Sequence, residues 1–236
     1  MDNKSVWVLG LCLVAGLGVL GFFLRDAAIS YKEYERTVTV RGLSEQEQLA
    51  DVVVWPIQYT AAGNDLQEVY ATLEENADKV QEFLKSRGVN DDEISLDTPL
   101  VTDRSAQRYG GDESARFRYV GSQVITVYSE RVEEVRQMKK EAGELGSRGV
   151  AISGDDYQFR TEYLFTKLND IKPEMIEEAT VEARKVAQKF AEDSGSRLGK
   201  IKTASQGQFS ISPRDSNNPH IKNVRVVSTI VYYLSD

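Results

Sequence analysis

The hydrophobic pattern begins with one long apolar run, which extends from Val6 to Leu24 and contains no charged residue. As an α-helix, these 19 residues would measure about 28 Å at 1.5 Å per residue, close to the roughly 30 Å hydrocarbon core of a bilayer. A helix is the expected form because the backbone polar groups of a spanning segment find no water in lipid. The pattern therefore predicts a membrane anchor over residues 1–29.

Two other interpretations of this segment are open. A cleaved signal peptide has an apolar region of about 7–15 residues and a small-x-small cleavage site. The run here is longer, and Arg25–Ala28 matches that site poorly, so cleavage near Ala28 is the alternative to retention. Lipidation at Cys12 is disfavoured because Leu11 stands where a small residue is expected, and Cys12 is interpreted as an apolar filler. Lys4 favours a cytoplasmic N-terminus, which would place residues 30–236 in the periplasm behind a single inner-membrane span.

Beyond a polar stretch predicted to be a linker (residues 26–35), strand-like and helical periods alternate. Strands are expected at 36–42 and 50–61, and Pro56 suggests an edge or a bulge in the second. An amphipathic helix follows, ended by Gly88; its apolar positions are Leu66, Val69, Tyr70, Leu73, Ala77, Val80, Phe83 and Leu84. Further segments are a strand over 94–100, a turn-rich stretch at 103–115, a strand over 116–128, a helix over 130–145 and a strand over 151–165. The order β-α-β-β-α-β over about 50–165 predicts a ferredoxin-like plait within an α+β fold.

The last third of the chain predicts a second α+β subdomain, formed by about 36–49 together with 166–236. Asp170 and Pro173 indicate the first turn of a helix. Small side chains dominate its apolar stripe, which would let the helix lie close to a sheet; the stripe is Met175, Ile176, Ala179, Ala183, Val186, Ala187, Phe190 and Ala191. Two strands, at about 200–212 and 223–234, are joined by a polar tip over 213–220.

Composition narrows the chemistry. The chain of 236 residues has 29 basic and 37 acidic residues, a net charge of −8, which is unlike the basic surface of a nucleic-acid-binding protein. One cysteine excludes an intramolecular disulfide and a multi-thiolate zinc site. One histidine, His220, excludes histidine-rich metal clusters and most Ser-His or Cys-His nucleophile designs.

Taken together, these elements resemble the SIMPL-domain family, whose bacterial branch includes YggE-like and periplasmic immunogenic proteins. The resemblance covers about residues 35–235 and rests on four stretches: RTVTVRG at 36–42, RGVNDDEISLDTPLV at 87–101, EEATVEARKVAQKFAEDSGSRLGKI at 177–201 and VRVVSTIVYYL at 224–234. It implies two interlocked α+β subdomains, an envelope location, large ring-like homo-oligomers and an association with oxidative-stress defence. It implies no catalytic residues.

Each candidate site has a simpler structural interpretation, which we favour. Asp91–Glu93 and Asp155–Asp156 offer carboxylates for a hard cation, but turns explain both. Gly110–Gly111 lacks the residues of a phosphate loop and suits a hairpin tip. His220 is expected in an exposed loop, and the strand aromatics Tyr157, Tyr163, Tyr232 and Tyr233 are expected in core or oligomer contacts rather than a ligand stack. No residue is therefore assigned a catalytic, cofactor-binding or metal-binding role, and no cofactor is expected.

The sequence leads us to expect a non-enzymatic, membrane-anchored envelope protein that self-assembles into a homo-oligomer. Its exposed strand edges would provide the surfaces for symmetric association. The tips at 103–115 and 213–220 are expected to form contacts or line an opening. The alternatives are a periplasmic sensor or adaptor that binds a peptide or small ligand, and, less favoured, a carboxylate-dependent hydrolase.

Overall fold

The computed structural model describes residues 3–33, 36–106, 116–153 and 159–235. The chain is a mixed α+β protein that divides into two compact units. Unit 1 comprises 1–46, 169–210 and 224–236, and unit 2 comprises 47–168 and 211–223. The tip between the last two strands, which the sequence analysis grouped with the C-terminal subdomain, therefore belongs to unit 2.

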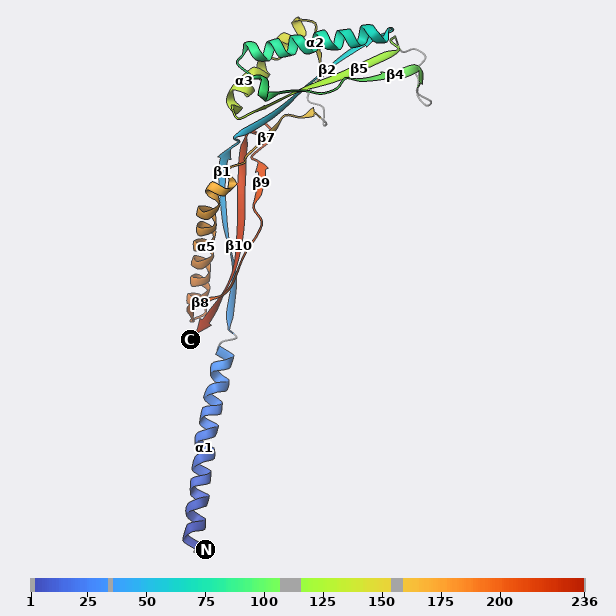
Figure 1. Ribbon diagram of the computed structural model, residues 1–236. Coiled ribbons are helices and arrows are strands. Elements are labelled where there is room, and N and C mark those ends of the chain that lie inside the picture. The colour runs from blue at the N-terminus through green and yellow to red at the C-terminus, as the bar shows by residue number, and fades with distance from the viewer. Residues whose placement is uncertain (1–2, 34–35, 107–115, 154–158, 236) are drawn as a thin grey trace. The chain divides into compact units, whose positions relative to one another are not determined.

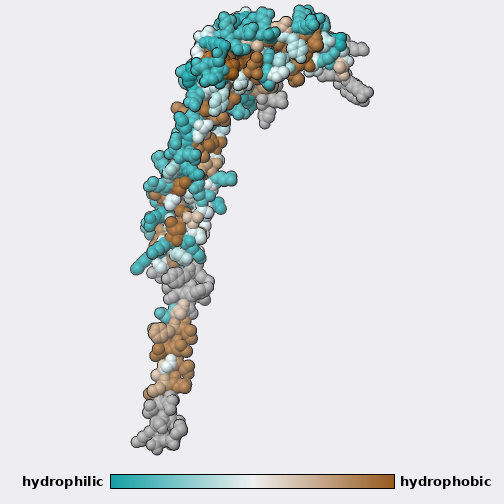
Figure 2. All heavy atoms as spheres, in the orientation of Figure 1, coloured by the Kyte–Doolittle hydropathy of each residue, from teal (hydrophilic) through white to brown (hydrophobic). Residues whose placement is uncertain are grey.

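The N-terminal segment forms one helix, α1 (Asn3–Glu33), so the expected linker over 26–35 is helical as far as Glu33. Within α1 the 18 residues Gly10–Ala27 are long and apolar enough to cross a membrane, and none of that window is buried. Figure 2 shows the middle part of this helix as a mainly brown, hydrophobic surface. Cys12 is a free, exposed cysteine on it.

Unit 2 is built on a sheet whose central strands are β2 (Val52–Gly63) and β5 (Tyr119–Ser129). They pair antiparallel along eleven residues, from Val53 opposite Ser129 to Gly63 opposite Tyr119. The order β3-β5-β2-β6 places β3 (Ile94–Leu96) and β6 (Ala151–Ile152) outside them, with β4 (Leu100–Asp103) also on β5 and β7 (Glu162–Leu164) also on β2.

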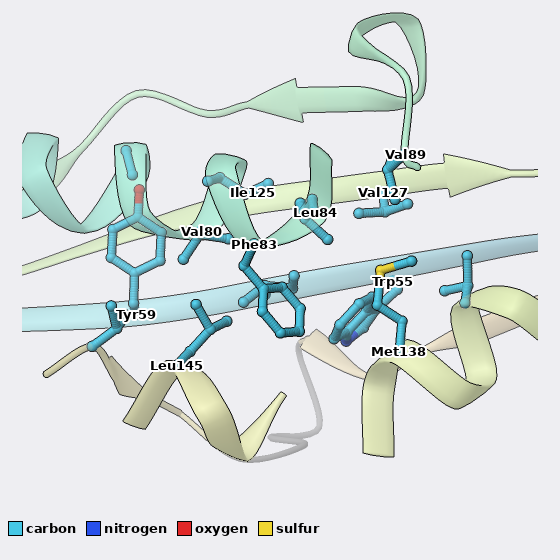
Figure 3. Packing of buried hydrophobic residues seen from close by; sticks show 14 of the residues in the cluster. Trp55, Tyr59, Val80, Phe83, Leu84, Val89, Ile125, Val127, Met138 and Leu145 are labelled. Atoms are coloured by element: carbon cyan, nitrogen blue, oxygen red, sulfur yellow. The ribbon is translucent and has the colours of Figure 1, made fainter. Parts of the chain in front are cut away.

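The helices of unit 2 are α2 (Leu66–Ser86), α3 (Val132–Glu141) and α4 (Gly143–Ser147), with short 3-10 turns at Asp91–Glu93 and Arg104–Ala106. Asp65 caps α2 by accepting hydrogen bonds from the backbone amides of Gln67 and Glu68. The predicted stripe of α2 is buried from Val69 to Leu84, whereas Leu66 and Tyr70 at its start are exposed. Figure 3 shows the core that results, with Phe83 beside Trp55 and Leu145.

Three predictions for unit 2 need correction. Within the described part of 151–165, the expected single strand is replaced by two short strands, β6 and β7, which pair with opposite ends of β2 at Thr60–Tyr59 and at Val54–Val52. Pro56 lies between these stretches, opposite Thr126 of β5. The strand over 94–100 is likewise split into β3 and β4, and the helix over 130–145 is split at Ala142 into α3 and α4.

Unit 1 packs helix α5 (Leu168–Asp193) on a sheet of order β1-β10-β8, with β9 also pairing with β10 (Figure 1). The strands are β1 (Thr37–Leu49), β8 (Arg197–Gln206), β9 (Ser210–Pro213) and β10 (Ile221–Ser235). The predicted stripe is confirmed for its small residues, since Met175, Ala179, Ala183, Ala187 and Ala191 are the buried residues of α5, but Ile176 is only partly buried and Val186 and Phe190 are exposed. Asp170 lies in the first turn of α5, as expected, whereas Pro173 falls beyond that turn, inside the helix, because α5 begins at Leu168.

Tyr59 gives unit 2 a pH-dependent contribution to stability. Its fully buried hydroxyl donates to Gln123 Oε1 at 2.9 Å. Burial, aided by the charge of Asp78, raises its pKa from 10.0 to about 12. The folded state therefore holds this proton more tightly than the unfolded state, and the stabilisation is complete below pH 10 and lost as pH rises towards 12.

We expect the free energy of unfolding to fall by about 2 kcal/mol more between pH 10 and 12 in the wild type than in Tyr59→Phe. Urea denaturation of both proteins across this range measures the difference. Parallel pH profiles would contradict the expectation.

Candidate functional site

A cavity of about 1220 Å³ opens in unit 2, and all of its lining residues belong to that unit. Its walls come from three segments: the second half of α3, residues 160–164 around β7, and residues 213–222, which join β9 to β10. Three segments distant in sequence thus meet around one space, hereafter the basic pocket.

The charge of the basic pocket is opposite to that of the chain. Among the described residues that line it, five are cationic, namely Arg136, Lys139, Lys140, Arg160 and Lys222, whereas two are acidic, Glu162 and Asp215. The whole chain has a net charge of −8. A local excess of cations in a concave, partly dehydrated space focuses a positive potential there.

The helix α3 supplies three of these cations from one face, because positions 136, 139 and 140 follow the helical spacing of three and four. Arg136 is paired with Glu133, and Lys140 Nζ donates to Gln137 Oε1 at 3.2 Å. Lys139 Nζ donates to Thr161 Oγ1 at 2.7 Å, which ties α3 to the segment leading into β7. These contacts hold the cations along the wall of the pocket.

Lys222 is the unusual member of the set. Its exposed fraction is 7%, and within the described residues Nζ forms no hydrogen bond or ion pair. Burial lowers its pKa below the usual 10.5, and the negative charge of Glu162 opposes this in part. The lysine is placed here by β10, whose buried positions alternate from Lys222 through Val224 and Val226.

His220 is half-buried in the pocket, so the expectation of an exposed loop position is wrong. Its backbone oxygen accepts from the amide of Ala50 at 2.8 Å, and its ring lies edge-on to Tyr163 with centroids 6.0 Å apart. Nδ1 is buried without a hydrogen-bond partner in the part of the chain that the structure describes. Burial, reinforced by the charge of Arg136, lowers the pKa of His220 below 6.5 and favours the neutral ring.

The polar tip folds back because Asp215 organises it. The carboxylate accepts from the backbone amides of Asn217 and Asn218 and from the Asn218 side chain. Arg214 Nε lies 3.0 Å from Asp215 Oδ2, and these contacts, that of Arg214 first, lower the pKa of Asp215 to about 2. A turn of polar composition therefore buries His220 instead of presenting it to solvent.

The carboxylates proposed as cation ligands serve local structure. Asp91 pairs with Lys85 at 2.6 Å. Glu93 accepts from Ser129, Arg131 and the Asn90 amide, which closes the turn before β3. Asp155–Asp156, Gly110–Gly111 and Tyr157 lie outside the described residues. Among the residues that are described, no group of three or more His, Cys, Asp or Glu side chains is arranged to hold a metal ion.

The remaining tyrosines divide between the two units. Tyr163 is buried in the core of unit 2, and Tyr232 is buried in the core of unit 1 with Val40 and Ile230. Tyr233 points to the other face of β10, where Lys202 Nζ lies 5.4 Å from its ring centroid. The core interpretation is confirmed for Tyr163 and Tyr232.

These features define the class: an α+β protein with an apolar N-terminal helix and a basic pocket in one of its two units. Residues 38–228 match the family model SIMPL, described as a protein of unknown function (DUF541). The chain therefore belongs to the SIMPL family. A comparison with curated proteins finds no match.

Proposed function

We propose that this protein is a non-enzymatic, membrane-anchored envelope protein that self-assembles into a homo-oligomer. In this proposal α1 crosses the inner membrane once and the body from residue 30 onward lies in the periplasm. Family membership supports an envelope location, and the unburied apolar window of α1 supports the anchor. A role in oxidative or envelope stress defence is part of the same proposal and rests on the SIMPL resemblance.

The carboxylates with clearly shifted pKa values do not support a general acid. A general acid needs a raised pKa, which keeps its proton near neutral pH. Where the pKa of a described carboxylate departs clearly from its ordinary value, hydrogen bonds from neighbouring groups outweigh burial and lower it; these residues are Glu75, Glu93, Asp103, Glu133, Glu144 and Asp215. Each of them is held in its charged form.

The two outer strands of the unit 1 sheet carry the assembly proposal. In the order β1-β10-β8, β1 and β8 each pair with β10 only, among the described residues. An outer strand offers unpaired backbone groups to another chain. Eight of the ten residues of β8 are exposed.

The charges of these strands are complementary. β8 holds Arg197, Lys200 and Lys202, whereas the later part of β1 holds Glu45 and Glu47. Like charges would oppose β8 against β8, and opposite charges favour β8 of one copy against β1 of the next. Such a head-to-tail contact is heterologous, and it closes into a ring when its rotation allows.

The strand order of unit 2 supports the plait interpretation. A ferredoxin-like plait has four strand positions, which here are occupied along the chain by β2, by β3 with β4, by β5, and by β6 with β7. Across the sheet these positions follow the order second, third, first, fourth, and the two central strands, β5 and β2, are antiparallel. We infer that unit 2 is a ferredoxin-like plait whose outer positions are each divided into two short strands.

One experiment tests anchoring and assembly together. Full-length protein is extracted from membranes with detergent; its intact mass gives the N-terminus, and light scattering gives the particle mass. We expect an intact residue 1 and a particle of several copies. Lys200→Glu should shift the particle to the monomer, because it places a negative charge opposite β1, and adding Glu45→Lys should restore assembly.

The matched control is Lys189→Glu, which reverses a lysine on α5 that pairs with Asp193. It should leave the particle mass unchanged. Mature protein beginning near residue 29 contradicts the anchor, and a monomer at micromolar concentration contradicts the assembly.

A further inference from the structure

We propose that the basic pocket of unit 2 binds a phosphate-bearing small molecule, with Lys222 as the central cation. This binding site is distinct from the β1 and β8 strands that carry the assembly proposal. It belongs to the body of the protein, so its test is independent of the anchor.

Lys222 is the observation that points to a ligand. A largely buried lysine whose ammonium group has no hydrogen-bonded partner is costly, because it loses much of its hydration and the charge of Glu162 compensates only in part. The described residues leave Lys222 in that state, with an exposed fraction of 7%, at the edge of an open cavity. An anion in the cavity would supply the missing charge and the missing acceptor.

The surrounding groups fit an anion with several oxygens. Lys139 and Lys140 come from α3, Arg160 precedes β7 and Lys222 comes from β10, so cations from three separate segments line the pocket. A phosphate group has up to two negative charges and several acceptor oxygens, which suits donors arriving from separate directions, and guanidinium groups bind it well. A carboxylate offers only two oxygens and one charge.

The size and the remaining wall of the pocket favour a phosphate ester over the bare ion. The volume of about 1220 Å³ far exceeds one phosphate group. Tyr163 and His220 form an aromatic pair at the wall, and the buried Nδ1 of His220 is free to bond with a ligand group. The ester's organic part would lie against this wall while its phosphate meets the lysines.

Glu162 gives the proposal a directional test. It lines the pocket and its charge acts on Lys222, so it would repel an anion bound beside that lysine. Removing this charge should therefore strengthen binding, whereas removing a pocket cation should weaken it.

The experiment is calorimetric titration of full-length protein, held in an uncharged detergent at low ionic strength, with glycerol 3-phosphate. We expect saturable binding with one site per chain. Lys222→Met should weaken it at least tenfold, and Lys140→Gln, at an exposed position that does not threaten folding, should weaken it severalfold. Glu162→Gln should tighten it severalfold. The matched control is Lys79→Gln, which removes a lysine of the same unit that pairs with Glu75 outside the pocket, and it should bind as the wild type does.

A second titration uses dihexanoyl phosphatidylglycerol below its micellar concentration, to separate the two sources of the phosphate. Tighter binding than glycerol 3-phosphate, still lost in Lys222→Met, assigns a lipid headgroup; equal or weaker binding assigns a soluble phosphate ester. The proposal is overturned if neither compound binds saturably, or if Lys79→Gln weakens binding as much as Lys222→Met.

Discussion

Gly42→Ala is expected to destabilise unit 1 by at least about 3 kcal/mol, because a side chain at this position has no room. A β-carbon on Gly42 would lie 1.7 Å from the backbone oxygen of Ala179 and 2.6 Å from the backbone nitrogen of Ala183. Both atoms belong to the backbone of α5, so no rotamer change relieves the clash. Helix and strand must separate, which opens the alanine stripe to water. Urea denaturation followed by circular dichroism measures the loss.

The matched control for this substitution is Gly146→Ala. Gly146 lies in the helix α4, and a β-carbon there would meet nothing within 4 Å. Alanine in a helix is more favourable than glycine by up to about 1 kcal/mol, so this variant should be neutral or slightly stabilised. Equal effects of the two substitutions would contradict the close approach of α5 to β1.

The second large effect is expected at Phe83, in the core of unit 2. Phe83→Ala should lower the free energy of unfolding by about 3–5 kcal/mol, as is typical of phenylalanine removed from a packed core. The ring is fully buried, and Arg87 lies over it with Cζ 3.8 Å from the centroid, so a cation–π contact is lost as well. Equilibrium unfolding monitored by the fluorescence of the neighbouring Trp55 reports the change.

Phe190→Ala is the control for Phe83→Ala. The Phe190 ring on α5 is 54% exposed, and its removal should cost less than about 1 kcal/mol. If Phe83→Ala costs no more than this exposed substitution, the packing shown in Figure 3 is wrong.

Long periodic elements could be predicted from the sequence, because burial of one face imposes a period on the residues. The stripe from Val69 to Leu84 in α2 and the alanines of α5 are examples. The prediction for 151–165 was wrong, because its alternating residues have the pattern of one long strand. Among the described residues of this segment, β2 pairs with those near its two ends, and Pro56, which lacks an amide hydrogen, lies between the two paired stretches.

The basic pocket could be predicted only in part. Polar residues over 213–220 correctly indicated a turn, and composition then suggested exposure. The turn is not exposed at His220, because the Asp215 carboxylate accepts hydrogen bonds from the backbone amides of the turn. The hydrogen bond from the Ala50 amide to the His220 backbone oxygen also holds the histidine inward. Lys222 carried a usable signal, since it continues the buried register of Val224 and Val226 by one step. The cations of the basic pocket come together through contacts among three segments that are distant in sequence, so no local sequence pattern could predict the pocket.

The division of the chain has a consequence for dissection of the protein. The polypeptide passes between the units four times, after residues 46, 168, 210 and 223. Terminal truncation therefore cannot isolate either unit, because removing residues 211–236 takes β10 from unit 1 and one wall of the basic pocket, including Lys222, from unit 2. Both units are expected to fold only when synthesis of the whole polypeptide is finished. A chain that stops near residue 210 should therefore stay incompletely folded and be degraded by proteases.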